Sequence, residues 1–462
     1  MIEDRTRRLL DVRLAHAQAD QRLPSVVAGL ARDGELIWTG SCGLVDGRAP
    51  DAGTQYRAGS ITKTFTAVVV LRMRDAGELA LSDQIGEHLD LAAAGASGEV
   101  AAMTVGQLLS HSAGLRAETA GPWWERTPGS GLGDLATSSL GSEAARFRPG
   151  QRHHYSNVGY GLLGAMIASK AGRPWYEVIS AELLTPLHMT RTTLRPQGPA
   201  AVGYAVHPYA DVLLAEPEHD AKAMAPAGQL WTTITDLARF ARFLTGDGKE
   251  IISSRTLAEM REPAVLWPST GQPWSAAYGF GLQLWNDAGT SYYGHTGSMP
   301  GFQAVLRVTD APGADTVLAA CNSTAGFGHS LATDLLEILA TQEPYLPAEW
   351  RPAEVEPGLL EVLGAWYWGP APYTLSLSGD ELELSMTGAD GPGMRFGRDG
   401  SGSWRGLDGY MAGEPLSIIA GSDGRPLALN IGSFIYSRTP YDPAAPIPGG
   451  VPKESWHAAP RA

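Results

Sequence analysis

The sequence predicts an α+β domain, built on one antiparallel sheet with helices around it, followed by a small antiparallel β-barrel. Strand-like segments lie close to the N-terminus and again between residues 278 and 320, and the stretch between them is mainly helical. A linker is then marked by four prolines, Pro344, Pro347, Pro352 and Pro357. Short alternating segments follow, separated by glycine-rich turns, and this pattern is typical of a small barrel or sandwich.

The first domain is expected to open with a helix and a β-hairpin. Leu10 and Leu14 recur at helical spacing in a charged segment near the N-terminus. Residues 25–30 and 35–39 then read as two strands, and Asp33-Gly34 between them is a strong hairpin signal. The two strands are therefore expected to pair directly.

Helices are predicted for the middle of this domain. Apolar residues are dense from Ile61 to Leu71, and Ser60 is expected in the first turn of that helix. Further helices are predicted at residues 159–170 and 235–244.

Strands return after these helices, at residues 278–285, 301–308 and 316–320, and a helix at 331–339 closes the domain. Because strands lie at both ends of the domain, we predict one sheet whose first and last strands come from opposite ends of this part of the chain.

The domain boundaries follow from these changes in composition. We assign residues 1–343 to the first domain, 344–357 to the linker, 358–445 to the barrel and 446–462 to a tail rich in proline and alanine. Strands of the barrel are predicted at residues 373–377, 381–384, 417–419 and 433–436.

Composition excludes several classes of function. The hydrophobic fraction of 44% and the charged fraction of 18% are those of a globular protein rather than a disordered or membrane protein. The net charge of −14 argues against nucleic acid as a partner, because phosphate binding requires a basic surface. Cys42 and Cys321 stand in no disulfide or metal-site pattern, and we expect neither a metal nor a cofactor.

The N-terminal residues contain no apolar signal core with a small-residue cleavage site. No later segment approaches the roughly 20 apolar residues that span a bilayer. These observations predict a cytoplasmic protein without a membrane partner.

Ser60-Ile61-Thr62-Lys63 places a hydroxyl and an amine three residues apart, on the same face of a helix. A serine hydroxyl becomes a strong nucleophile when a neighbouring base takes its proton. Lysine can be that base where its pKa is lowered, which arginine cannot match. Because Ser-x-x-Lys also occurs by chance, the motif alone is weak.

Two further motifs carry candidate groups. In Tyr155-Ser156-Asn157, the phenol could relay a proton and the amide could orient the substrate. In His295-Thr296-Gly297, the histidine could be a titratable donor, and glycine at a strand edge lets a substrate backbone approach closely. Taken alone, the tyrosine also fits packing before a helix, and the histidine fits a satisfied residue of a strand edge.

Together the three motifs have the order and spacing of the serine β-lactamase and penicillin-binding-protein superfamily, which residues 5–340 resemble, most closely its class C-like branch. Other segments match this superfamily as well: Arg57–Lys63, Leu108–Leu115, Phe147–Gly150 and Ala225–Gly228. The resemblance implies a β-lactamase/transpeptidase-like domain, with an all-helical subdomain beside the sheet.

The resemblance also implies roles for individual residues. Ser60 would be the nucleophile, Lys63 its base and Tyr155 the second proton carrier, and His295 stands where β-lactamases usually carry lysine. The oxyanion hole would be the backbone N–H groups of Ser60 and Ser298. The supporting residues would be Asn157, Thr296 and Gly297.

Within the superfamily, the whole layout resembles the penicillin-binding-protein-type thioesterases, which cyclise nonribosomal peptides. This resemblance implies a lipocalin-like barrel and a peptidyl thioester substrate, carried by a peptidyl carrier protein and ending in a D-configured residue. Ser60 would take the peptide, and the peptide's own amine would release it as a macrolactam. Arg438 would lie near the carboxyl end of the substrate, although a strand-end ion pair explains it equally well.

Two alternatives remain open. A hydrolase, either an esterase or a D-amino-acid amidase or peptidase, would use the same residues with water as the acceptor, and neither acceptor leaves a motif of its own. A binding module that has kept the fold is the third reading, against which the intact Ser60, Lys63 and Tyr155 argue. The sequence makes no prediction of oligomeric state.

Overall fold

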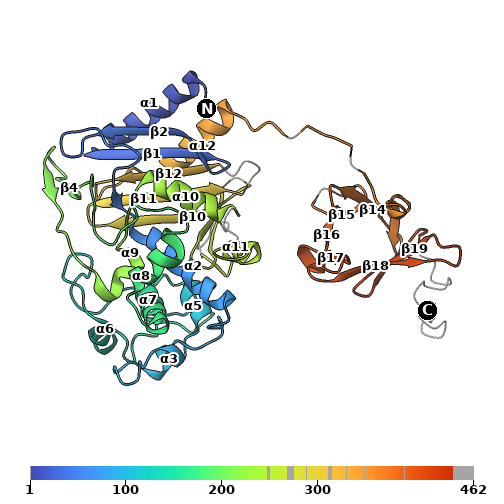
Figure 1. Ribbon diagram of the computed structural model, residues 1–462, viewed down its shortest axis with the longest axis horizontal. Helices are drawn as coiled ribbons and strands as arrows, with labels where there is room; N and C mark the ends of the chain where they lie inside the picture. The colour runs from blue at the N-terminus through green and yellow to red at the C-terminus, as the bar shows by residue number, and fades with distance from the viewer. Residues whose placement is uncertain are drawn as a thin grey trace, which may run out of the picture. The chain divides into compact units, whose positions relative to one another are not determined.

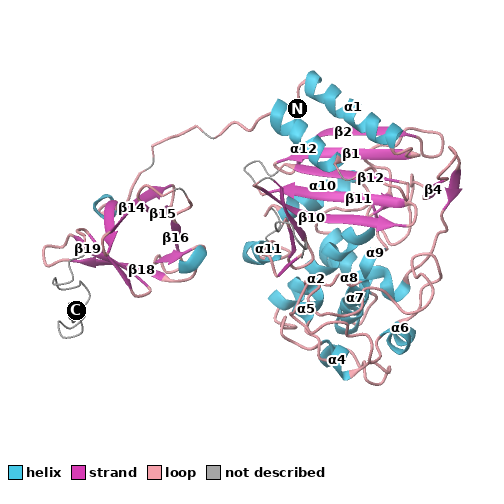
Figure 2. Ribbon diagram, turned by 180° about the vertical axis from the view of Figure 1, so that it is seen from behind, coloured by secondary structure: helices cyan, strands magenta, loops and turns pink. Residues whose placement is uncertain are grey.

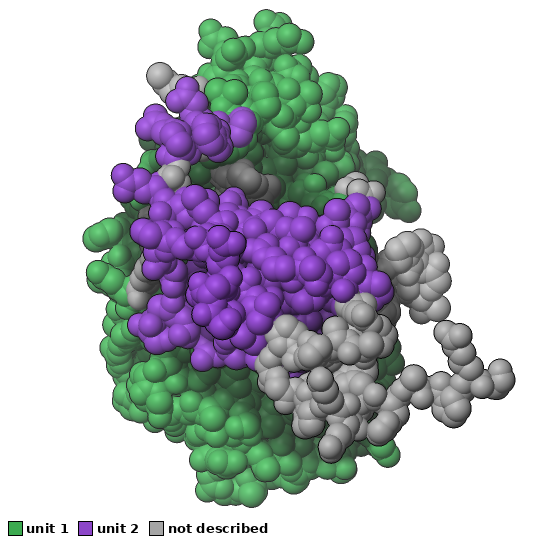
Figure 3. Space-filling model, turned by 90° about the vertical axis from the view of Figure 1, so that its right-hand side faces the viewer, with its two compact units in different colours: residues 1–346 green, residues 347–462 purple. Residues whose placement is uncertain are grey.

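The computed structural model describes residues 2–246, 250–267, 275–287, 289–310, 315–328, 330–347, 349–352, 354–389 and 391–440. The chain divides into two compact units, residues 1–346 and 347–462, which Figure 3 colours green and purple. The predicted tail, residues 446–462, lies outside the described residues.

The first unit is built on an eight-stranded antiparallel sheet with the order β2-β1-β12-β11-β10-β9-β8-β7. Strands β2, β1, β12, β11 and β10 can be followed in Figure 1. Its strands are β1 (Ser25–Arg32), β2 (Glu35–Gly43), β7 (Val265–Leu266), β8 (Ala276–Tyr278), β9 (Gln283–Asp287), β10 (Thr290–Met299), β11 (Phe302–Thr309) and β12 (Thr316–Cys321). Because β1 pairs directly with β12, the prediction that one sheet joins strands from both ends of the domain is confirmed.

The turn between β1 and β2 is the predicted hairpin. Asp33 has φ of 51° and Gly34 has φ of 78°. Two central residues with positive φ are typical of a type I′ turn, whose twist matches that of the flanking strands.

The single strand predicted at residues 278–285 is wrong in detail, because the chain reverses there between β8 and β9. Gly281 in the turn has φ of 78°, a conformation that favours glycine. A Cβ at Gly279 would lie 2.1 Å from the carbonyl oxygen of Met260, so only glycine fits this packing.

Helices cover both faces of the sheet. They are α1 (Asp4–Asp20), α2 (Thr62–Asp75), α10 (Ile234–Leu244), α11 (Ser254–Met260) and α12 (Leu331–Gln342). Side chains of a strand alternate between its faces. Accordingly Val26 and Ala28 join the apolar cluster with α1 and α12, whereas Val27 joins the larger cluster with α2 and α10.

The remaining helices gather in one region beside the sheet, as Figure 2 shows. They are α3 (Ile85–His88), α4 (Gly98–Ala101), α5 (Val105–Leu109), α6 (Leu132–Ser139), α7 (Asn157–Ala171), α8 (Trp175–Ile179) and α9 (Ala225–Gly228). Short pairs of strands lie outside the large sheet, β3 (Tyr56–Arg57) with β6 (Trp231–Thr232) and β4 (Tyr204–Val206) with β5 (Leu213–Ala215). The side chains of α2 are almost all buried, so this helix stands between the sheet and the helical region.

The second unit begins with the short helix α13 (Leu359–Val362) and forms a closed barrel of eight antiparallel strands. The strands are β13 (Gly364–Trp368), β14 (Ala371–Ser378), β15 (Glu381–Met386), β16 (Met394–Arg398), β17 (Trp404–Gly406), β18 (Pro415–Ala420), β19 (Pro426–Ile431) and β20 (Phe434–Ser437). Each strand pairs with the next along the chain, and β13 closes on β20. Apolar side chains such as Trp366, Phe396 and Leu429 fill the interior.

Within the described ranges, no helix combines the length and hydropathy needed to cross a membrane. Cys42 and Cys321 are free thiols, and Cys321 is buried.

Candidate active site

Ser60 lies in a 3-10 turn, Gly59–Ile61, that runs directly into α2. Gly59 has φ of 53°, and a Cβ at this position would lie 2.5 Å from the backbone nitrogen of Ser298. Glycine at residue 59 therefore lets the turn approach β10 at backbone distance. Ser60 keeps part of its surface exposed, although the helix behind it is buried.

Lys63 follows one helical turn later, and its Nζ lies 2.9 Å from Ser60 Oγ. The amine also donates to the carbonyl oxygen of Ala227 at 2.6 Å and has no exposed surface. Burial lowers the pKa of Lys63 to about 7, and the nearby carboxylates of Glu118 and Glu125 oppose that shift. A large fraction of the amine is therefore neutral near pH 7, which allows it to take the proton of Ser60.

The ring of Tyr155 lies beside the amine of Lys63. The centroid of its ring is 4.9 Å from Lys63 Nζ and 4.1 Å from the ring of His111. Burial raises the pKa of the Tyr155 phenol, and hydrogen bonding to Ser60 opposes this shift only in part. Tyr155 therefore stays protonated and can hand a proton to a leaving group beside Ser60.

Asn157 is the first residue of α7, a helix whose N-terminus is capped by the Ser156 hydroxyl. The amide of Asn157 donates to Glu118 Oε1 at 2.6 Å, so it orients this carboxylate rather than standing free for a substrate.

The His295-Thr296-Gly297 triplet lies within β10, where alternation decides which side chains can face the substrate. Thr296 and Ser298 are exposed, whereas His295 and Gly297 are buried. A Cβ at Gly297 would lie 1.9 Å from the carbonyl oxygen of Ala58, so this strand and the segment before Ser60 pack at backbone distance. The Thr296 backbone N–H and hydroxyl both donate to the side chain of Gln283.

For His295 the sequence predicts a titratable donor near the site, and the structure buries the ring beside Tyr278. Its Nδ1 lies 2.5 Å from the Thr296 carbonyl oxygen and its Nε2 lies 3.0 Å from the Tyr278 hydroxyl. Nδ1–H thus donates to the carbonyl and Nε2 accepts from Tyr278. Burial lowers the pKa of His295 to about 3, so the ring is neutral at physiological pH. This geometry argues for a positioning role behind the site.

The two predicted oxyanion donors come from segments that the structure brings together. The close approach of Gly59 to Ser298 puts the backbone nitrogen of Ser298 beside the turn that holds Ser60. Two backbone N–H groups from different segments are a common way to stabilise the oxyanion of a tetrahedral intermediate. Their role stays a prediction.

The carboxylates of Glu118 and Glu125 belong to the site, but no sequence motif predicts them. Glu118 accepts from Asn157 and from the Trp124 indole, while burial raises the pKa of Glu125. Both lie in the loop after α5, close enough to Lys63 to influence its pKa. The sequence signal nearby, residues 108–115, indicates only the helix end that precedes this loop.

Arg438 lies in the second unit. Its guanidinium donates to three backbone carbonyls of the barrel and lies 3.8 Å from the centroid of the Trp366 ring. The three acceptors are the carbonyl oxygens of Glu361, Leu363 and Ala365. These contacts give Arg438 a role in the barrel, and its contact with substrate stays a prediction.

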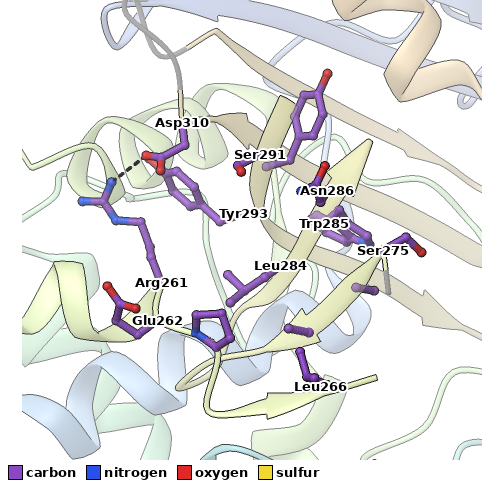
Figure 4. A pocket seen from close by; sticks show the side chains of 14 residues that line it. Arg261, Glu262, Leu266, Ser275, Leu284, Trp285, Asn286, Ser291, Tyr293 and Asp310 are labelled. Carbon is purple, nitrogen blue, oxygen red and sulfur yellow. Dashed lines mark hydrogen bonds and ion pairs between the residues drawn. The ribbon is translucent and has the colours of Figure 1, made fainter. Parts of the chain in front are cut away.

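A separate cavity of about 420 Å³ lies at the β7–β10 side of the sheet (Figure 4). Arg261 forms an ion pair with Asp310 across it at 3.4 Å and lies over the ring of Tyr293. None of the predicted site residues lines this cavity.

A protein-family model described as Beta-lactamase matches residues 10–341, which is well over half of the chain. The chain belongs to the beta-lactamase family. The predicted membership of the β-lactamase and penicillin-binding-protein superfamily is therefore confirmed, as is the α+β domain followed by a barrel. A second model, described as Domain of unknown function (DUF7586), matches residues 355–438.

A relative of known name also belongs to the penicillin-binding proteins. Penicillin-binding protein 4 of Amycolatopsis lactamdurans is 28% identical over 369 residues, which cover 74% of this chain and 93% of that protein. With Ser60, Lys63 and Tyr155 assembled as described, this beta-lactamase family member is a serine enzyme of the penicillin-binding-protein type.

Two solved structures share the fold at low identity. The structure of SurE is 22% identical with a TM-score of 0.59, and the match covers 94% of this chain and 99% of that one. The D-amino acid amidase from Ochrobactrum anthropi SV3, complexed with D-phenylalanine, is also 22% identical with a TM-score of 0.59. That match covers 73% of this chain and 97% of the amidase.

Proposed function

We propose that this enzyme releases peptides by cyclisation. Ser60 takes a peptidyl group from a thioester on a peptidyl carrier protein, and the N-terminal amine of the same peptide then displaces Ser60. The product is a head-to-tail macrolactam, and a D-configured C-terminal residue is preferred. A cytoplasmic location, where carrier-bound peptides are made, is part of this proposal.

The observation that carries the proposal is the likeness to SurE, a cyclase of nonribosomal peptides of the penicillin-binding-protein type. The match extends over 94% of this chain, so it includes the barrel as well as the first unit. SurE has also been solved with D-Leu, at the same 22% identity and a TM-score of 0.58. That ligand supports the preference for a D-residue.

The chemistry follows from the assembled groups. Lys63 Nζ removes the proton of Ser60 Oγ, which attacks the thioester carbonyl, and the C–S bond breaks as the thiol leaves with a proton relayed by Tyr155. In the second half, the amine attacks the acyl-enzyme ester, loses a proton to the Lys63–Tyr155 pair and forms the amide bond. The Ser60 oxygen leaves and regains its proton, so the enzyme returns to its starting state.

The carboxylates of Glu118 and Glu125 fit an amine acceptor. Both lie near Lys63, and a pair of negative charges would attract the ammonium group of a peptide N-terminus before it loses its proton. The same charges would equally attract the α-ammonium group of a D-amino acid amide, so they favour an amine-bearing substrate without choosing between cyclisation and hydrolysis.

A second candidate function is hydrolysis, by a D-amino-acid amidase or peptidase or by an esterase. The likeness to the D-amino acid amidase favours it, because 97% of that chain is matched by 73% of this one. In this case water attacks the same acyl-enzyme.

Product analysis with a linear peptidyl N-acetylcysteamine thioester tests the proposal. The peptide is prepared with a D- or an L-configured last residue, and products are separated by mass. We expect the macrolactam as the main product of the D-form and little turnover of the L-form. Linear acid alone, together with rapid release of ammonia from D-amino acid amides, would establish the hydrolase instead. The Ser60→Ala variant is the control for uncatalysed cyclisation.

A further inference from the structure

A second cavity, of about 580 Å³, is lined in part by residues that neighbour the active-site segments in the sequence. Arg57, three residues before Ser60, lines it. So does Gln229, two residues after the Ala227 carbonyl that holds Lys63. Phe302 lines it from the strand that follows β10.

Arg57 is a buried cation without a carboxylate partner. Its side chain is 4% exposed, and its two Nη atoms contact Gln229 Oε1 at 3.1 Å and His219 Nδ1 at 3.2 Å. Its Nε has no hydrogen-bond partner, nor does Nε2 of His219. No ion pair to Arg57 occurs in the described part of the chain. Burial lowers the pKa of Arg57 to about 10, so the guanidinium is still charged at neutral pH.

Two of the other basic residues that line the cavity, unlike Arg57, form ion pairs with carboxylates. Arg126 is paired with Glu216 at 2.5 Å and Arg195 with Asp220 at 2.8 Å. The remaining charged side chains, Lys222 and Glu218, are exposed at the cavity. Glu218 and Glu125 of the active-site loop act on Arg57 only through space.

A buried charge without a directly paired counterion is unfavourable, so such a site favours an anionic ligand. One wall of the cavity beside Arg57 is apolar: Trp231 and Phe302 pack edge to face at 5.2 Å, and the Arg57 guanidinium lies 5.8 Å from the Trp231 ring. Besides its paired and its exposed charges, the cavity thus has an apolar wall and one buried cation without an ion pair, which suits a short aliphatic chain that ends in a carboxylate.

We propose that this cavity binds a carboxylate-bearing side chain of the acyl group, with Arg57 as its counterion. The inference rests on acyl transfer to Ser60 and holds whether water or an amine removes the acyl group. It makes an acidic residue next to the acylating residue a specificity element of the substrate.

Matched thioester substrates test the inference. Two peptidyl N-acetylcysteamine thioesters differ only in a penultimate Glu or Gln, and the rate of Ser60 acylation is followed by intact-protein mass. We expect the Glu peptide to acylate at least about tenfold faster, and Arg57→Gln to bring the ratio of the two rates close to one. Equal rates in the unmodified enzyme would overturn the inference, even where acylation itself is fast.

Binding without turnover separates this inference from the proposed function. Glutarate is titrated calorimetrically into the unmodified enzyme and into Arg57→Gln, with glutaramide as the uncharged control. We expect glutarate to bind and the variant to weaken it at least about tenfold. Absence of glutarate binding, or equal affinity for glutaramide, would overturn the inference. If neither thioester labels Ser60, the proposed function fails, and the glutarate titration still shows whether the cavity binds a carboxylate.

A second variant covers the case in which Arg57→Gln does not fold. Lys222 is exposed at the cavity, so Lys222→Gln is expected to fold and to reduce the preference for the Glu peptide by about two- to threefold, because solvent and salt screen an exposed charge. A preference that is absent from the unmodified enzyme would contradict the inference without any variant.

Discussion

Acylation of Ser60 should follow the titration of a single buried amine. The pKa of Lys63 falls from 10.5 to about 7 on burial. At pH 7, about half of the amine is then neutral, whereas an unshifted lysine would be neutral in only about three molecules in ten thousand, a difference of about 10³-fold in active base. The acylation rate rises with pH because only the neutral form of the amine is a base. The acylation rate should therefore rise tenfold per pH unit below pH 7 and level off above it.

Single-turnover acylation measured by intact-protein mass from pH 5.5 to 9 checks this dependence. Lys63→Arg keeps a cation but loses the base, so it should lower the rate by at least about 10³-fold. Glu118→Gln removes a charge that raises the pKa of Lys63, so its acid limb should move to lower pH. Glu337→Gln, an exposed change on α12, is the control and should leave the limb in place. A rate independent of pH between 6 and 8, or a limb that Glu118→Gln moves upward, would refute the reasoning.

Three further predictions concern the same site. Tyr155→Phe removes the phenolic proton and should slow acylation by about 10²–10⁴-fold, whereas Tyr209→Phe, at a fully exposed tyrosine, should not; equal rates would remove Tyr155 from the relay. Gly297→Ala would place a Cβ 1.9 Å from a backbone oxygen and should destabilise the fold by about 2–4 kcal/mol in chemical denaturation, unlike Gly133→Ala, which meets open space. Lys63→Met should abolish acylation yet stabilise the first unit by about 1–3 kcal/mol, since no amine need be desolvated; a lower melting temperature would contradict this.

Local signals in the sequence predict the parts of the fold that depend on neighbouring residues. The Asp33-Gly34 turn and helix α7 follow from turn residues and apolar periodicity that are visible within about 15 residues. The split of residues 278–285 into two strands depends instead on Gly279 packing against Met260, which the local pattern does not contain.

For the barrel, the sequence predicts only some of the eight strands. Strands β14, β15, β18 and β20 overlap predicted segments, whereas β13, β16, β17 and β19 were not predicted. The missed β17 has only three residues, and β19 begins with Pro426, a residue type that is rare inside strands. Their pairing follows from closure of the barrel, which is a property of all eight strands.

The same division applies to the active site. Ser60 and Lys63 share one helix face, so spacing alone predicts their contact. Three other contacts join segments that are not neighbours in the sequence. They are the hydrogen bonds of His295 with Tyr278, of Lys63 with the Ala227 carbonyl and of Asn157 with the Glu118 carboxylate. Tertiary packing decides these contacts, and no motif records them.

The most direct test of the central claim compares one D-terminated peptidyl thioester with a free N-terminal amine and the same thioester with that amine acetylated. Acylation of Ser60 needs no amine, but release as a macrolactam does. We predict that the acetylated peptide accumulates on Ser60 as a stable acyl-enzyme, seen by intact-protein mass, while the free peptide is released as the macrocycle. Rapid release of linear acid from both peptides at equal rates would contradict the account.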